Sequence, residues 1–79
     1  REIKLKNREF KLFLYLLRRP NTVITKDELF ANVWGDGFFS DGTLNVHIRK
    51  IREAIERDPG KPEYVLTVWG DGYRFCGGR

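Results

Sequence analysis

Four apolar residues recur at helical spacing in the second half of the chain, and they constrain how that segment packs. They are Leu44, Ile48, Ile51 and Ile55. Because such positions lie along one side of an α-helix, the pattern predicts a helix that begins near residues 41–43 and ends before Pro59. We expect these four residues to pack against the core, which turns the side chains on the opposite side of the helix toward solvent.

The opposite side of this helix combines an exposed apolar residue with polar and basic ones. The helical period turns Val46 toward solvent. Its neighbours on this side are Thr43, Arg49 and Lys50, and the flanking residues are Asn45, His47 and Arg52. Such a surface suits the major groove of DNA, since valine can contact a thymine methyl group and the donors can reach guanine edges and phosphates. The alternative is a solvated helix with one stray valine.

A strand fragment and a helix are predicted at the start of the chain. Residues 3–5 alternate apolar and polar side chains and indicate the remnant of an N-terminal antiparallel sheet. A helix follows, with Asn7 as its N-cap, and it stops at Pro20. The apolar residues expected on its core face are Phe10, Phe13, Leu14 and Leu17.

A second helix is predicted from Thr25 to about Trp34, after a short strand at residues 23–24. Thr25 and Glu28 have the spacing of a capping box, in which a hydroxyl and a carboxylate each accept from a free backbone N–H. Gly35 ends this helix.

The chain closes with a predicted β-hairpin. Residues 64–69 and 73–76 are rich in strand-forming side chains, and the Gly-Asp-Gly at residues 70–72 favours a tight turn. Strand alternation puts Thr67 and Trp69 on one side, which we expect to face outward. The fold class is therefore α+β, with three helices, a C-terminal hairpin and the remnant of an N-terminal sheet.

Size and composition limit the classes of function. A chain of 79 residues has the size of one small domain, which we expect to span residues 1–79. One cysteine and one histidine exclude an internal disulfide and disfavour a zinc site, and no cofactor is expected. No apolar run is long enough to cross a membrane. We expect a cytoplasmic domain, and the lack of methionine indicates a piece of a longer protein.

Catalysis is not expected. Asp36 and Asp41 are close in sequence, but no histidine pair, phosphate-binding loop or serine nucleophile motif accompanies them. The net charge of +4 favours a polyanionic partner where the positive charges gather on one surface, as they do in residues 47–52.

Several segments carry the motifs of one known protein family. They are Asn-Arg-Glu-Phe at 7–10, Thr-Lys-Asp-Glu-Leu at 25–29, Val-Trp-Gly at 33–35, the basic helix at 43–52 and the hairpin at 67–75. Together they resemble the winged helix-turn-helix output domain of OmpR/PhoB-type response regulators, the effectors of bacterial two-component signalling. The resemblance covers nearly the whole chain. It implies sequence-specific binding of double-stranded DNA, regulation of transcription, and a receiver domain upstream.

The resemblance also implies which residues contact DNA. Those that match base-contacting positions are Thr43, Asn45, Val46 and Lys50. Those that match phosphate-contacting positions are Trp34, His47, Arg49, Arg52, Thr67 and Tyr73. Trp69 and Arg74 belong to the wing, the hairpin after the recognition helix. For Trp34 and Tyr73, a core position with one polar tip is an equal alternative.

Three residues depart from the family pattern. Lys50 stands where arginine is frequent, and it discriminates guanine less well because lysine lacks the planar fork of arginine. Gly42 stands where an arginine often contacts phosphate. Trp69 replaces a wing arginine that often enters the minor groove, so we expect its indole to stack on sugar or backbone instead.

Further partners are implied for the whole protein. The expected DNA targets are tandem half-sites about one helical turn apart, bound by a homodimer. The loop at residues 35–42 matches one that contacts RNA polymerase, with Phe38 and Phe39 as the candidates, and the alternative is that both fold back over the core. A protein-interaction module that uses the third helix or the wing is the competing function. RNA is disfavoured because its major groove is narrow.

Overall fold

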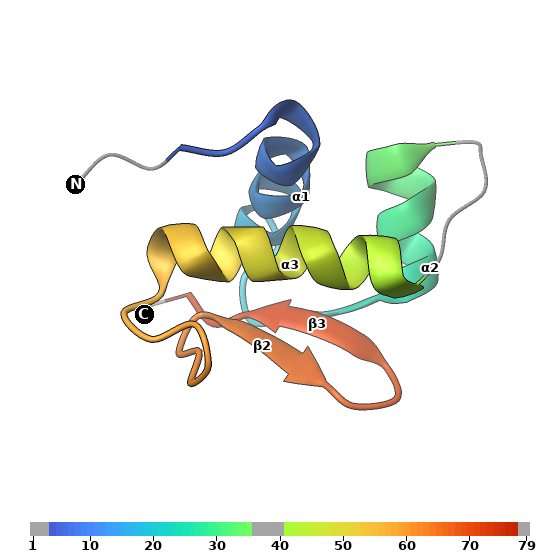
Figure 1. Ribbon diagram of the computed structural model, residues 1–79. Helices are drawn as coiled ribbons and strands as arrows, with labels where there is room; N and C mark the ends of the chain where they lie inside the picture. Colours follow the sequence, from blue (N-terminus) through green and yellow to red (C-terminus); the bar gives the residue numbers. More distant parts are fainter. Residues whose placement is uncertain (1–3, 36–40, 78–79) are drawn as a thin grey trace.

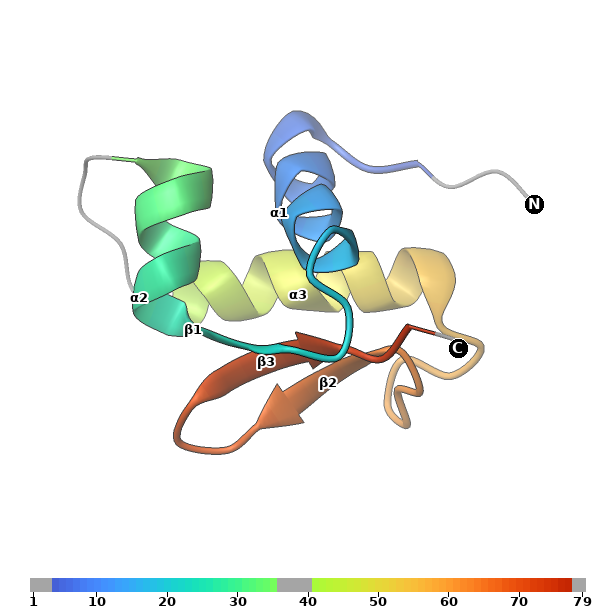
Figure 2. The ribbon, with the colours of Figure 1, turned by 180° about the vertical axis from the view of Figure 1, so that it is seen from behind.

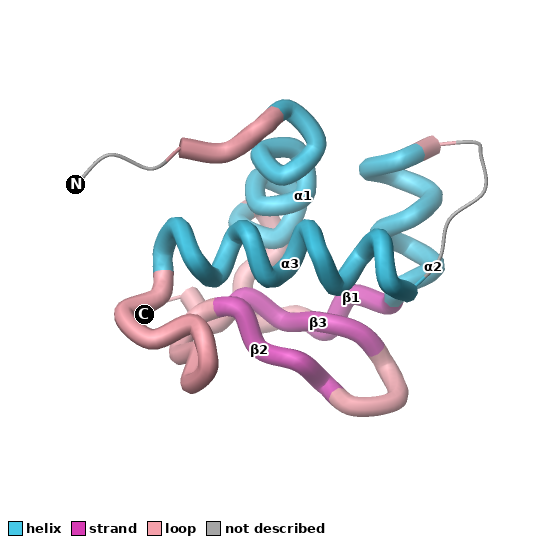
Figure 3. The backbone as a smooth tube through the Cα atoms, in the orientation of Figure 1, coloured by secondary structure: helices cyan, strands magenta, loops and turns pink. Residues whose placement is uncertain are grey.

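The computed structural model describes residues 4–35 and 41–77 and confirms the predicted α+β architecture. In these residues, helices pack on one face of a three-stranded antiparallel sheet (Figure 1, Figure 3). In chain order the elements are α1 (Asn7–Leu17), β1 (Val23–Thr25), α2 (Lys26–Leu29), the π-helical turn η1 (Phe30–Trp34), α3 (Asp41–Ile55), β2 (Val65–Val68) and β3 (Gly72–Phe75).

The central strand of the sheet is β3, which pairs with β1 on one side and β2 on the other. Ile24 and Thr67 both lie opposite Tyr73, and Val65 lies opposite Phe75. The helix α3 runs along the sheet, and α1 stands across α3 in the views from the front and from behind (Figure 1, Figure 2). The hydrophobic core lies between these layers.

The apolar stripe of α3 is buried as predicted. Leu44, Ile48 and Ile51 are at most 1% exposed, and Ile55 is half-buried at the end of the helix. Burial of one such side chain contributes about 1.5–3 kcal/mol to stability. The stripe therefore fixes the rotation of α3 about its axis, and with it the side that faces solvent.

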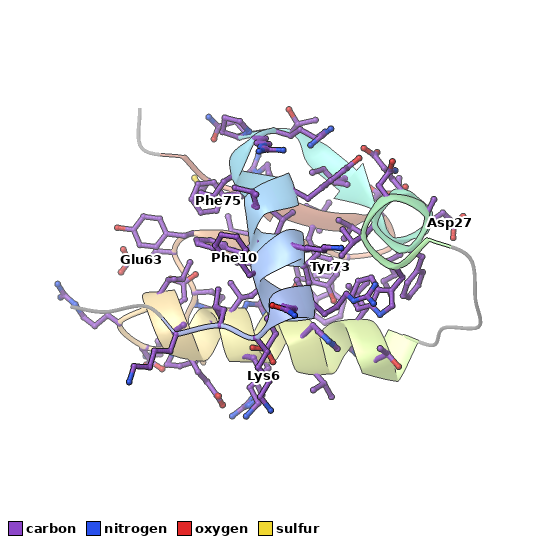
Figure 4. All side chains as sticks on the ribbon, turned by 90° about the horizontal axis from the view of Figure 1, so that it is seen from above. Lys6, Phe10, Asp27, Glu63, Tyr73 and Phe75 are labelled. Carbon is purple, nitrogen blue, oxygen red and sulfur yellow. The ribbon has the colours of Figure 1, made fainter. Side chains whose placement is uncertain are left out.

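The core face of α1 differs from the prediction. Leu12 and Leu16 are fully buried, whereas Phe10 is 53% exposed and Leu17 is 37% exposed. In Figure 4, Phe10 lies on the opposite side of α1 from Tyr73. Residues 10–17 are apolar at every position except Lys11, so periodicity alone selects no face. Packing against the other elements determines which face of α1 is buried.

The N-terminal boundary also differs. Lys4 and Leu5 have no regular secondary structure, so the described part of the predicted strand at residues 3–5 is not a strand, and residue 3 lies outside the described residues. A strand needs a neighbour to pair with. Lys6 rather than Asn7 is the N-cap of α1, and its backbone N–H donates to Glu9 Oε1 at 3.0 Å.

The start of α2 is as predicted, but only half of the capping box is formed. Thr25 Oγ1 accepts from the Glu28 backbone N–H at 3.1 Å. The Glu28 carboxylate instead accepts from the Tyr15 hydroxyl at 2.6 Å, which joins α1 to α2 and raises the pKa of Tyr15. Gly35 ends η1 with a φ of 76°, a conformation that glycine adopts readily.

The hairpin is confirmed, but Thr67 of β2 faces the core, whereas the sequence predicted that it faces outward. Thr67 lies on the inner face, since strand alternation puts it on the same side as the buried Val65 and its hydroxyl accepts a hydrogen bond from Arg52 of α3. Trp69 is 89% exposed because it lies in the turn beyond the end of β2. Gly72 approaches β1 so closely that a Cβ there would overlap the Ile24 carbonyl group.

A buried carboxylate joins the end of α3 to the start of β2. Glu56 is 3% exposed and accepts from the backbone N–H groups of Glu63, Tyr64 and Val65 at 2.8–3.0 Å. Three such donors compensate a carboxylate for the loss of water. Glu56 thereby holds the connection between α3 and β2.

Replacing Glu56 removes the acceptor of three backbone N–H groups. We predict that Glu56→Ala lowers the free energy of unfolding by about 3 kcal/mol, measured by urea denaturation. Glu53→Ala is the matched control, since Glu53 is exposed and the loss of its two ion pairs changes stability by less than about 1 kcal/mol. Equal effects of the two substitutions would contradict this role of Glu56.

Candidate nucleic-acid interface

The exposed side of α3 carries the apolar and basic residues that the sequence predicts there. Val46 is 57% exposed, and the side chains of Arg49 and Lys50 are 75% and 57% exposed. Thr43 lies half-buried at the start of the helix. The first turns of α3 therefore offer an apolar and cationic surface to a partner.

One acidic residue borders this surface. Glu53 Oε2 lies 3.3 Å from Arg49 Nε, and Glu53 Oε1 lies 3.9 Å from Lys50 Nζ. Because all three side chains are exposed, each pair stabilises the fold by about 0.5 kcal/mol at most. Glu53 follows the two exposed cations by about one helical turn, and it competes with any bound anion for Arg49 and Lys50.

A groove of about 360 Å³ lies between α3 and the wing, which here comprises β2, β3 and their turn. Its lining includes Asn45, Arg49 and Arg52 from the helix and Thr67, Trp69 and Tyr73 from the wing. The turn of the wing projects at the same end of the molecule as the N-terminus of α3 (Figure 1, Figure 2). Two segments predicted to contact DNA thus border one groove.

Arg52 joins α3 to β2. Its Nε donates to the Val65 carbonyl at 2.9 Å, and its Nη2 donates to Thr67 Oγ1 at 2.8 Å. Burial lowers the pKa of the Arg52 guanidinium, and Tyr73 and Glu56 act in the opposite direction. Arg52 and Thr67, both predicted to contact phosphate, therefore also bind each other and position the wing.

Tyr73 and Asn45 meet across the groove. Tyr73 is 3% exposed, and its hydroxyl donates to Asn45 Oδ1 at 2.7 Å. The ring of Tyr73 belongs to the core, so Tyr73 fits the alternative prediction of a core residue with one polar end. That polar end, the hydroxyl, is hydrogen-bonded to Asn45, a residue predicted to contact bases.

Trp34 and His47 form an edge-on aromatic contact near the start of α3, with ring centroids 5.0 Å apart. Trp34 is half-buried and packs against the core. His47 Nδ1 lies 2.8 Å from the Thr43 carbonyl oxygen, and because a carbonyl only accepts, Nδ1 carries a proton. A second N–H, on Nε2, is then present only in the charged imidazolium.

The remaining predicted residues lie at the tip of the wing, on the far face of the sheet or outside the described residues. Trp69 is at the tip of the wing. Arg74 is half-buried on β3 opposite Val23 and Leu66, on the face of the sheet that points away from α3. Phe38 and Phe39 lie outside the described residues.

Two basic residues near the interface were missed by the sequence analysis. Lys26 lines the groove. The Arg8 guanidinium lies 5.6 Å from the centre of the Trp34 ring and donates to the Val33 carbonyl at 2.8 Å. Both residues belong to other helices, and their approach to α3 depends on tertiary packing that no local pattern records.

The described residues hold neither a cluster of metal ligands nor a membrane-spanning helix. Across residues 4–35 and 41–77, no group of three His, Cys, Asp or Glu side chains is placed to hold a metal ion. In the same residues, no helix has the length and apolar character needed to cross a membrane.

Comparisons with known proteins agree with this geometry. The family described as "Transcriptional regulatory protein, C terminal" matches residues 1–75. The transcriptional regulatory protein YvrH of Bacillus subtilis is 52% identical over 66 residues, which are 82% of this chain and 28% of YvrH.

Solved structures show the same fold. The response regulator DrrB of Thermotoga maritima, an OmpR/PhoB homologue, is 39% identical with a TM-score of 0.86 over 95% of this chain and 34% of DrrB. The DNA-binding domain of the response regulator AdeR, solved in complex with an intercistronic region, is 25% identical with a TM-score of 0.78 over 95% of this chain and 74% of that structure.

The chain belongs to the family of C-terminal domains of transcriptional regulatory proteins, and it has the winged-helix fold of OmpR/PhoB-type response regulators. The predicted family and fold class are thus confirmed. The chain spans about a third of the length of the curated relatives that it matches.

The two arginines of α3 are expected to differ in their structural roles. Arg52→Ala leaves the Val65 carbonyl and Thr67 without their donor, and we predict a loss of about 2 kcal/mol in the free energy of unfolding. Arg49→Ala removes only an exposed pair with Glu53 and costs less than about 0.5 kcal/mol. Urea denaturation of both variants measures the difference. An Arg52→Ala variant with unchanged stability would contradict the role of Arg52 in holding β2 to α3.

Proposed function

We propose that this domain binds duplex DNA in a sequence-specific manner, with α3 in the major groove and the wing along the backbone. The observation that carries the proposal is the exposed side of α3, where Val46 lies near Arg49 and Lys50. An α-helix fits the major groove of B-DNA, and this helix offers an apolar contact together with hydrogen-bond donors. The fold shared with AdeR, whose DNA-binding domain was solved in complex with an intercistronic region, supports DNA as the partner.

Base contacts in this proposal come from residues 43–50 of α3. The residues are Thr43, Asn45, Val46 and Lys50. Val46 has the apolar side chain to meet a thymine methyl group, and Lys50 donates to the acceptors of guanine as a point charge. Because Lys50 lacks a planar fork, one base pair is read less strictly than an arginine would read it.

Phosphate contacts come from the rim of the same surface. The residues are Trp34, His47, Arg49 and Thr67, and each offers a donor to phosphate oxygens. Only the charged form of His47 can serve, because its Nδ1 already faces the Thr43 carbonyl. Arg52 and Tyr73 have hydrogen-bond partners within the protein, so in this proposal they act by holding the wing and Asn45.

The whole protein is proposed to work as a response regulator. A receiver domain upstream would control pairing of two copies on tandem half-sites, and pairing raises affinity by making the second binding event intramolecular. Contact with RNA polymerase through Phe38 and Phe39 also belongs to this proposal. The confirmed family and the likeness to DrrB support it.

A second candidate function is protein binding by the wing. It is favoured by Trp69, which is 89% exposed at the tip of the hairpin and could anchor an interface. Salt separates the two functions, since phosphate-dominated binding weakens steeply as salt rises and an apolar interface changes little.

Selection of duplexes from a random DNA pool tests the proposed function. The chain is expected to enrich one repeated motif, and the affinity for that motif is expected to fall steeply between two salt concentrations. Failure to enrich any motif, or binding that does not respond to salt, would contradict sequence-specific DNA binding.

Lys50 and Arg49 provide a matched pair of substitutions. Lys50→Ala is predicted to cost about 1–3 kcal/mol on the selected site and to relax the preference at one base pair. Arg49→Ala is predicted to weaken binding to all sequences alike and to reduce the salt slope by about one. Fluorescence anisotropy titrations on the selected duplex and on single-base variants measure both effects. Equal losses on every duplex for both variants would defeat this division of roles.

A further inference from the structure

The hydrogen bond between Tyr73 and Asn45 links the core of the domain to its DNA-facing surface. Tyr73 lies on β3 with its ring buried, and Figure 4 shows it on the side of α1 that faces α2. Asn45 lies exposed on the flank of α3. The Tyr73 hydroxyl and Asn45 Oδ1 are 2.7 Å apart, so a rigid ring holds an exposed amide.

The direction of this bond follows from the two atoms that it joins. The Tyr73 hydroxyl carries a proton, and Asn45 Oδ1 is an amide oxygen, which only accepts. The amide oxygen, and not the amide nitrogen, is thus the partner of Tyr73.

We infer that Tyr73 is a positioning residue that sets the base preference of Asn45. It holds Oδ1 toward the wing, and the covalent geometry of the amide then turns the two Nδ2 hydrogens away from the wing. This inference rests on the proposed function, since it concerns which base Asn45 recognises in the major groove.

The amide of Asn45, held by Tyr73, is expected to recognise different bases from an unrestrained asparagine amide. A free asparagine pairs with adenine through two hydrogen bonds, accepting from N6 and donating to N7. Asn45 Oδ1 keeps a second lone pair, but Tyr73 holds this oxygen toward the wing. The amide therefore turns its Nδ2 donors toward a base and favours an acceptor edge such as purine N7, guanine O6 or thymine O4. The advantage of adenine over guanine is thereby reduced at the base pair that Asn45 reads.

This role excludes a phosphate contact by the same hydroxyl. A phosphate oxygen only accepts, and Tyr73 has a single O–H, which it already donates to Asn45. Contact with phosphate would require Tyr73 to release Asn45. The two roles therefore predict different results when the hydroxyl is removed.

Selection from a random DNA pool with Tyr73→Phe tests the inference. The variant keeps the buried ring and frees the amide, so the ratio of adenine to guanine is expected to rise by about fivefold or more at one base pair. The other positions of the motif are expected to stay unchanged. In an Asn45→Ala background, Tyr73→Phe is expected to change no preference, because the residue through which it acts is gone.

The contrary outcomes are distinct. If Tyr73→Phe weakens binding to all sequences by one factor with the motif unchanged, the hydroxyl contacts phosphate or serves only the fold, and the inference is overturned while DNA binding stands. A shift of the motif that persists in the Asn45→Ala background overturns it as well. If the unaltered chain enriches no motif, the proposed function fails and this inference fails with it.

Discussion

Burial of the apolar stripe of α3 against the sheet and α1 is the constraint on which the rest of the structure depends. Leu44, Ile48 and Ile51 are excluded from water, and each contributes on the order of 1.5–3 kcal/mol. Because that side of the helix faces the core, Val46 and Arg49 on the opposite side face solvent. The surface proposed to contact DNA is thus a consequence of how the core is packed.

Polar contacts then fix the wing relative to this helix. Arg52 holds β2 from the middle of the contact, Glu56 holds the connection at its end, and Tyr73 reaches Asn45 at its beginning. Apolar packing alone tolerates small slides of a helix over a sheet, whereas hydrogen bonds at three points specify one register. A groove of defined width between α3 and the wing follows from that register.

The sequence predicted what depends on local periodicity and missed what depends on distant partners. The stripe of α3, the cap at Thr25 and the exposed Val46 were predictable because helical spacing and capping chemistry are local. The partners of Glu56 lie seven to nine residues away, in the connection to β2 and at its first residue, so no local pattern predicts the burial of this carboxylate. The face of α1 was mispredicted because nearly every residue of that helix is apolar, so that only tertiary packing could expose Phe10.

The central claim is that α3 and the wing form one surface for DNA. Titration of the ¹⁵N-labelled chain with the selected duplex, followed by NMR, tests it most directly. The account predicts that amide signals of residues 42–50 and of the turn between β2 and β3 change together, while the exposed face of α1 around Phe10 stays unchanged. Changes centred on α1, with α3 unaffected, would contradict the account.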